Sequence, residues 1–234
     1  MPPQSQVIAG VTVPDTPLIT KAIAFARQHL PDQAYNHVMR SWLTCHLLVT
    51  RLPSEVQQQI DTELYAIAII LHDLGWSKSA ELISKDKCFE VDGANCAREF
   101  VKREGNPAEW DKHRLQLLWD VIALHTTPGI GAHKEIEVAL ACGGIMTELL
   151  GPEVARGNMG EVITVTGEEM KRIAEEFPRE GLREYLKDTI CGFCREKPQT
   201  TYWNFQSGYG EEFVEGYNLE GKRMVDVMLK YMKE

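Results

Sequence analysis

Several features are scarce or absent in this sequence of 234 residues, and each absence narrows what the protein can be. No apolar stretch approaches the roughly 20 residues that a membrane-spanning helix needs, so we expect no membrane partner. The first ten residues lack a basic start and an apolar segment, so we expect no signal peptide and a cytoplasmic protein. A formal net charge of −9 argues against a nucleic-acid partner, since nucleic-acid binders carry basic patches.

Signatures of phosphate binding and of β-sheets are also missing. The sequence has neither GxxxxGK[ST] nor GxGxxG, and no alternating pattern that would support a sheet. Cys191 and Cys194 form a CxxC, but a second pair at zinc-site spacing is absent. We therefore expect two core cysteines one helical turn apart, with a redox or metal role as the alternative.

What the sequence does have is apolar residues at helical spacing along most of its length. Ser54 with Gln57 and Thr166 with Glu169 fit capping boxes. The predicted helices cover residues 14–31, 36–52, 54–75, 92–103, 107–125, 134–150, 168–176, 180–195 and 210–233. We predict one all-α domain over residues 1–234, with its core at about 11–215. The first ten or so residues are expected to be disordered, and a short hairpin or irregular segment is expected near 151–166.

The end of one predicted helix carries two side chains that bind metals. The apolar run AIAIIL is followed directly by His72 and Asp73, and Gly75 marks the end of the helix. Both side chains are good ligands for a divalent cation, and a buried acid beside a histidine is costly without a partner. The alternative is a histidine that donates to a carbonyl, with Asp73 as a helix cap.

Two further histidines lie at or near helix ends. His37 begins an apolar helix, with Arg40 and Ser41 on the same face, and His125 ends the run LLWDVIAL. Helix ends that meet at one point form a metal pocket in a helical bundle. The pattern therefore favours a metal centre over an isolated dipeptide.

The order of these motifs resembles the HD-domain superfamily of metal-dependent hydrolases, and is most similar to its cyanamide hydratase-like branch. The resemblance covers about residues 11 to 215. The stretches that carry it are NHVMRSW, LHDLG, CFEVDGANCAREFV, WDVIALHT and FPREGLREYLKDTICGFCREKPQTTYWNF. It implies an HD-type helical bundle and a hydratase that adds water to a small nitrile, such as cyanamide to give urea. A related nitrile or isocyanide is also open.

The resemblance also implies the site. His37, His72 and Asp73 match the metal ligands, with Zn²⁺ as the expected cofactor and Fe, Mn or Co as alternatives. HD phosphohydrolases have a later aspartate as fourth ligand, but the segment EVALACGGIMTELLG at 137–151 has none. Glu148 or water is left for that position. Homo-oligomers are common in this branch, so we expect one here.

Three other residues are candidates around the metal. His125 is expected to donate a proton or to hold the attacking water. Arg40 is expected to orient Asp73 or the substrate, with a structural ion pair as an equal alternative. Asp92 is expected either to cap its helix or to lie at the pocket, where it supports a ligand residue or contacts the substrate. We expect Lys78, where many HD hydrolases bind phosphate, to be exposed.

Two positions depart from the resemblance, and two other functions stay open. Trp203 stands where aspartate is usual, and Cys142 is unusual in its segment, so either can change the substrate if it lines the pocket.

One alternative function is an HD-type phosphohydrolase acting on nucleotides or phosphate monoesters, against which the missing aspartate argues. The other is a non-catalytic helical binding module, against which the histidines argue.

Overall fold

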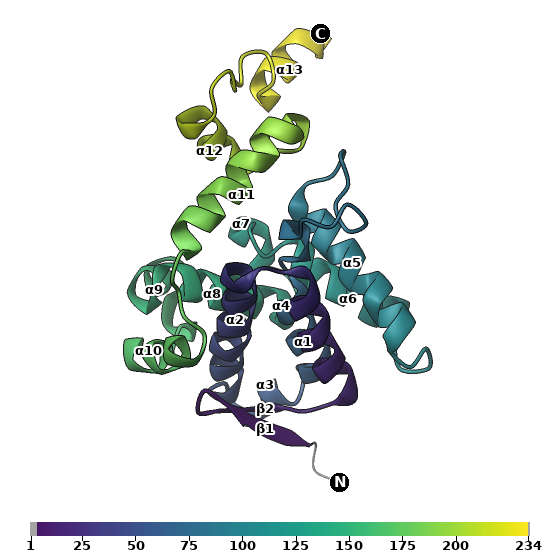
Figure 1. Ribbon diagram of the computed structural model, residues 1–234, viewed down its shortest axis with the longest axis vertical. Coiled ribbons are helices and arrows are strands. Elements are labelled where there is room, and N and C mark those ends of the chain that lie inside the picture. Colours follow the sequence, from purple (N-terminus) through teal and green to yellow (C-terminus); the bar gives the residue numbers. More distant parts are fainter. Residues whose placement is uncertain (1–3, 234) are drawn as a thin grey trace. The chain divides into compact units, whose positions relative to one another are not determined.

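The computed structural model describes residues 4–233 and is predominantly helical (Figure 1), which confirms the all-α prediction. The α-helices are α1 (Pro17–His29), α2 (Asp32–Thr50), α3 (Ser54–Gln57), α4 (Thr62–Leu71), α5 (Phe89–Glu104), α6 (Lys112–Ala123), α7 (Pro128–Gly131), α8 (Ile136–Leu150), α9 (Pro152–Met159), α10 (Gly167–Glu176), α11 (Leu182–Glu196), α12 (Gln206–Phe213) and α13 (Met224–Tyr231). Short 3₁₀ helices are η1 (Leu74–Trp76), η2 (Gly160–Val162) and η3 (Pro198–Thr200).

Two strands at the beginning of the described chain form an antiparallel hairpin, β1 (Ser5–Ile8) and β2 (Val11–Pro14). The prediction of disorder over the first ten residues is therefore wrong for residues 5–8, and residues 1–3 lie outside the described part. Alternating burial explains the pairing, since Val11 and Val13 point into the core while Thr12 is exposed. The alternation covers only four residues in each strand, which is too short for the sequence pattern to predict a hairpin.

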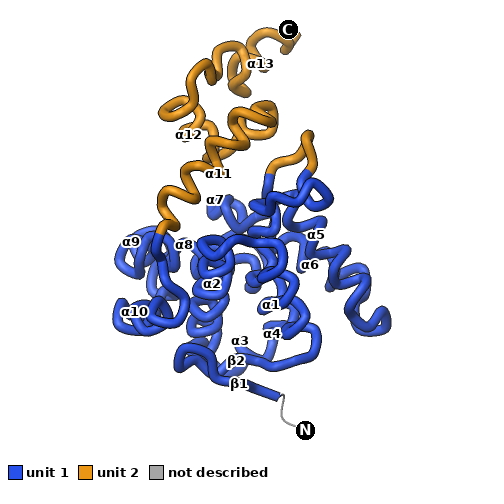
Figure 2. The backbone as a smooth tube through the Cα atoms, in the orientation of Figure 1, with its two compact units in different colours: residues 1–83, 89–180 blue, residues 84–88, 181–234 orange. Residues whose placement is uncertain are grey.

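The contacts divide the chain into two compact units (Figure 2). Unit 1 comprises residues 1–83 and 89–180, and unit 2 comprises residues 84–88 and 181–234. The Nζ of Lys197 donates to the carbonyls of Ser84 and Lys87, which joins the short segment to the helices of unit 2. Two compact units do not decide whether the chain is one domain, so the single domain over residues 1–234 stays a prediction.

The core of unit 1 is built around α4. Its residues Leu64–Leu71 are all buried, and the helix packs against α1, α2, α6 and α8. A helix that is apolar on every side is stable only when neighbours surround it. The Asp61 side chain accepts a hydrogen bond from the Leu64 backbone N–H and so caps the helix. The residues that follow Leu71, beginning with His72 and Asp73, therefore lie in the interior of unit 1.

The structure corrects three predicted elements. The helix predicted at 54–75 is two helices, α3 and α4, because Asp61 begins a new one; Pro53 precedes α3 without a side-chain cap, so no capping box forms at Ser54. The helix predicted at 210–233 is α12 and α13, separated at Gly216, whose φ is +78°. The segment near 151–166 is mostly helical, since Pro152 begins α9 and η2 follows, and residues 163–166 are irregular.

Other predictions about the elements are confirmed. The capping box of Thr166 and Glu169 begins α10. Cys191 and Cys194 are buried, unpaired thiols of α11 in unit 2. Within residues 4–233, no helix has the length and apolar character to cross a membrane.

Candidate metal centre

The His-Asp pair lies at the end of the central helix. Helix α4 ends at Leu71, His72 is its C-cap residue, and Asp73 leads directly into η1. Both side chains are fully buried. The apolar run thus places two polar side chains inside unit 1, where water cannot solvate them and other groups must do so.

Close packing of α5 holds this pair in place. A Cβ atom on Gly93 of α5 would lie 2.6 Å from the His72 carbonyl oxygen, and one on Gly75 would lie 2.0 Å from the Phe89 carbonyl oxygen. Only glycine allows two backbones to approach this closely. The first turn of α5 therefore lies directly against the backbone that carries His72 and Asp73.

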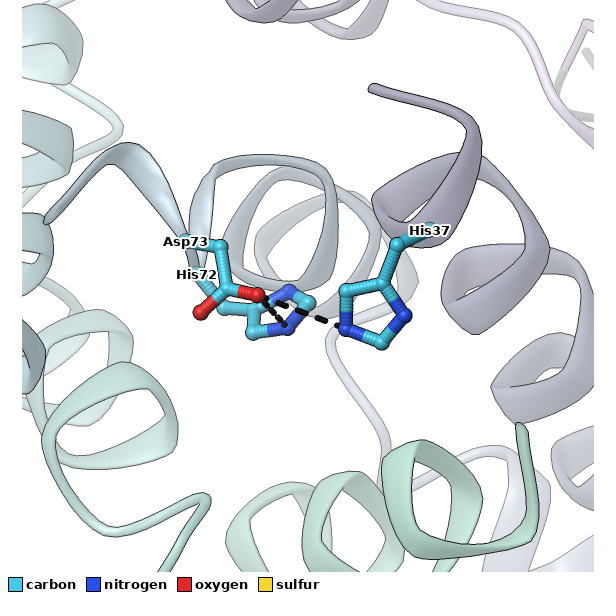
Figure 3. Close-up of side chains that lie close together, drawn as sticks. All are labelled: His37, His72 and Asp73. Carbon is cyan, nitrogen blue, oxygen red and sulfur yellow. Dashed lines mark ion pairs between the residues drawn. The ribbon is translucent and has the colours of Figure 1, made fainter. Parts of the chain in front are cut away.

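His37 completes the group from α2. Its Nε2 lies 3.3 Å from Oδ2 of Asp73, and Nε2 of His72 lies 3.2 Å from the same oxygen (Figure 3). One ligand atom from each of the three residues lies within 4.8 Å of the other two. Among residues 4–233 this is the set of histidine, cysteine and acidic side chains whose spacing suits a metal ion.

The inward-facing atoms of this group lack hydrogen-bond partners. Neither Oδ1 nor Oδ2 of Asp73 accepts a hydrogen bond, and Nε2 of His72 makes none. Leaving a buried polar atom unsatisfied costs about 1–3 kcal/mol, and a charged one costs more. A divalent cation on these atoms would remove that cost, so the three side chains fit a metal by both chemistry and position.

The ring orientations of two histidines are fixed by their own helices. Nδ1 of His72 lies 2.7 Å from the Ile69 carbonyl oxygen, and Nδ1 of His125 lies 2.6 Å from that of Ile122. A carbonyl can only accept, so each Nδ1 must carry the proton. When such a ring is neutral, it presents the lone pair of Nε2, which is the form that binds metals or accepts protons.

His125 lies beside the three candidate ligands. Its Nε2 is 3.7 Å from Oδ1 of Asp73, whereas His37 and His72 face the other oxygen of this carboxylate, Oδ2. Its ring centroid is 4.7 Å from that of His72. Burial, and after it the neighbouring His72, lower the pKa of His125 to about 4, so this ring is neutral near pH 7.

Charges from neighbouring side chains set the electrostatics of the centre. Burial disfavours a charged His37, but Glu148 and Asp73 outweigh it and raise the pKa of His37 to about 9. Burial also works against the ionised Asp73, yet His72 and His37 hold the pKa of this carboxyl well below its usual range. The carboxylate therefore stays ionised and ready to bind a cation.

Arg40 does not contact Asp73. Its Nε donates to Oε1 of Glu148 at 2.6 Å, and its NH1 donates to the carbonyls of Phe177 and Pro178. The expectation that Arg40 orients Asp73 is therefore wrong, and the structure shows the ion pair with Glu148 instead. A contact of Arg40 with the substrate stays a prediction. Glu148 lies behind His37, with Oε2 at 2.6 Å from Nδ1 of that ring.

Asp92 is buried in the first turn of α5, next to Gly93. The helix begins at Phe89, three residues earlier than predicted, so Asp92 lies inside it and the N-cap alternative is wrong. The three-ligand group does not include Asp92. Its contact with a substrate stays a prediction.

Two aromatic rings enclose the centre. Trp76 of η1 stacks on His37, with ring centroids 5.7 Å apart and an interplanar angle of 15°, and Phe89 packs edge-on against His125 at 5.8 Å. Both side chains are buried. Neither ring was expected in the site, although Trp76 directly follows LHDLG and Phe89 lies within CFEVDGANCAREFV. Their packing limits the access of water.

The remaining predicted positions lie elsewhere. Lys78 is exposed, as predicted. The Cys142 thiol donates to the Leu124 carbonyl, next to His125, and burial raises its pKa to about 11, so it stays protonated. Trp203 is 65% exposed in unit 2, where its indole N–H donates to the Lys222 carbonyl.

Comparison with known proteins found no family model that matches the chain and no curated protein similar to it.

Proposed function

We propose that this protein is a zinc-dependent hydro-lyase of the HD type that adds water to a small nitrile, such as cyanamide to give urea. One observation carries the metal part of the proposal. His37, His72 and Asp73 converge in a buried space, and atoms of His72 and Asp73 have no hydrogen-bond partner there. The nitrile part follows from the resemblance of the motifs around these residues.

The ligand set suits catalytic zinc. Two histidines and one carboxylate leave a coordination position open, which distinguishes catalytic from structural zinc sites. A divalent cation held there supplies Lewis acidity and lowers the pKa of a coordinated water toward about 7. Iron, manganese and cobalt accept the same ligands, so elemental analysis identifies the metal.

His125 is proposed to move the proton. The attacking water forms a C–O bond to the nitrile carbon while one C–N π bond breaks, and the water proton passes to Nε2 of His125. The ring returns that proton to the nitrile nitrogen, and the imidic acid becomes the amide when its second proton moves from oxygen to nitrogen. The Nδ1–H bond to the Ile122 carbonyl keeps Nε2 in the accepting form, which supports the base role.

A direct test measures metal and product together. We expect about one zinc per purified chain, its loss in His72→Ala, and urea formation from cyanamide in the zinc-loaded wild type alone. Absence of metal after reconstitution would overturn the proposal and leave the binding module. Two metals per chain, with phosphate release from a panel of nucleotides, would instead select the phosphohydrolase.

The remaining expectations are part of the same proposal. A cytoplasmic location, a small-molecule substrate and a homo-oligomer all come from the sequence analysis. Light scattering tests the last one, since a monomer would have a mass of 26.5 kDa. A mass that is a multiple of this value is the expected result.

A further inference from the structure

The three proposed ligands are not held in the same way. His72 is fixed by the carbonyl three residues before it, so the local helix sets its orientation. His37 has a different partner: its Nδ1 lies 2.6 Å from Oε2 of Glu148, a residue 111 positions later in the chain. The direction of Nε2 of His37 therefore depends on α8, which carries Glu148.

Glu148 is itself fixed on its other oxygen. Nε of Arg40 donates to Oε1 at 2.6 Å, and NH1 of Arg179 donates to the same oxygen at 3.0 Å. Arg179 also donates to the backbone carbonyls of Glu148 and Leu149. Both carboxylate oxygens are thus occupied by donors, and the side chain cannot turn toward the metal ligands without losing these bonds.

The charges make this arrangement stable inside unit 1. Glu148 is buried with 1% side-chain exposure, as are His37 and Arg40. An isolated carboxylate would be very costly at such a position, whereas two guanidinium groups compensate its charge. A carboxylate that accepts a hydrogen bond from a metal-ligating histidine fixes the tautomer of the ring. It also makes the other ring nitrogen more basic and therefore a stronger metal ligand.

We infer that Glu148, held by Arg40 and Arg179, is a positioning residue that directs Nε2 of His37 into the metal centre. The inference rests on the proposed metal centre. It replaces the expectation that Glu148 is a fourth metal ligand, because Oε2 of Glu148 contacts Nδ1 of His37, the ring nitrogen that faces away from Asp73. In this inference Arg40 acts through Glu148, to which its Nε donates.

Glu148→Gln is the informative variant, because all three partners of this carboxylate are donors. In either orientation of the new amide side chain, its NH₂ group would face a hydrogen-bond donor, so at least one of these bonds would be lost. Glu137→Gln is the matched control: Glu137 is a buried glutamate of the same helix that accepts from the Asp61 backbone N–H, away from His37. Arg179→Ala is a milder second variant, since the Arg179 side chain is 39% exposed.

Two measurements on the full chain test the inference. Zinc affinity, by competition with a chromophoric chelator, should fall about 10- to 100-fold in Glu148→Gln, by less in Arg179→Ala, and not in Glu137→Gln. In ¹⁵N-histidine NMR spectra of the metal-free protein, His37 should show a protonated Nδ1 in the wild type and Glu137→Gln. That signature should be lost or exchange-broadened in Glu148→Gln.

The outcomes separate this inference from the proposed function. Wild-type zinc affinity in Glu148→Gln, with an unchanged His37 spectrum, would overturn the inference and leave the proposed function standing. A wild type that binds no zinc overturns the proposed function, and the NMR comparison then still decides whether Glu148 sets the His37 ring. If Glu148→Gln does not fold, unchanged affinity and an unchanged His37 spectrum in Arg179→Ala would contradict the inference.

Discussion

At the scale of single residues, the chemistry of the centre depends on which ring nitrogen carries the proton. Hydrogen bonds at Nδ1 fix this for His72 and His125 through carbonyls of their own helices, and for His37 through Glu148. Each ring then offers Nε2 toward the same carboxylate, that of Asp73. These three bonds thus support the proposed metal centre with His125 as an adjacent proton acceptor.

His125→Asn separates the proposed proton transfer from the packing. The shorter amide can still donate to the Ile122 carbonyl, but it loses the Nε2 lone pair. We expect turnover of cyanamide to fall about 100- to 10,000-fold while the zinc content stays at the wild-type value. Steady-state kinetics with elemental analysis measure both quantities, and wild-type turnover in this variant would contradict the role of His125.

The positions of His37, His72 and His125 at or near the ends of apolar helices predicted that they meet, and the resemblance singled out His37, His72 and Asp73 as metal ligands. The partner of His37 could not be predicted in the same way. Which acidic side chain faces Nδ1 depends on how α8 packs against α2, and no local pattern encodes that packing. The same holds for Arg40, whose partner is 108 positions away.

At the scale of the elements, the site depends on how closely α5 approaches the segment after α4. Gly93→Ala should lower the free energy of unfolding by about 1–3 kcal/mol, because the new methyl group would meet the His72 carbonyl at 2.6 Å. Zinc affinity should fall as well, since that carbonyl belongs to a ligand residue. Chemical denaturation and the chelator assay measure the two effects.

Gly192→Ala is the control for this substitution. Gly192 lies within α11, and a Cβ atom there would meet nothing within 4 Å. Alanine at this position should stabilise the helix by about 0.5–1 kcal/mol and leave zinc affinity unchanged. Equal losses of stability in both variants would show that the approach of α5 has no special role.

Long apolar helices were predictable, and short elements were not. The pattern identifies α2, α5 and α8 because each repeats over at least four turns. The hairpin of β1 and β2 has four residues in each strand, and α9 begins at a proline within a glycine-containing connection. Periodicity over so few residues is weak, so tertiary packing decides these elements.

At the scale of the whole molecule, the metal should contribute to stability. Unfolding separates His37 from His72 and Asp73, so zinc binds mainly the folded chain. With free zinc at 100 times the dissociation constant, the free energy of unfolding should rise by about 2.7 kcal/mol. Thermal unfolding with and without a chelator measures this, and an equal shift in His72→Ala would show that zinc acts elsewhere.

The two kinds of histidine anchor also set an order of assembly. His72 and His125 are oriented by bonds that span three residues, so they are in place once their own helices form. The bond that orients His37 closes a loop of more than a hundred residues, and such contacts form late because closing a long loop costs entropy. We therefore expect a folding chain to carry two aligned imidazoles before the third, with all three rings in place only when α8 docks against α2.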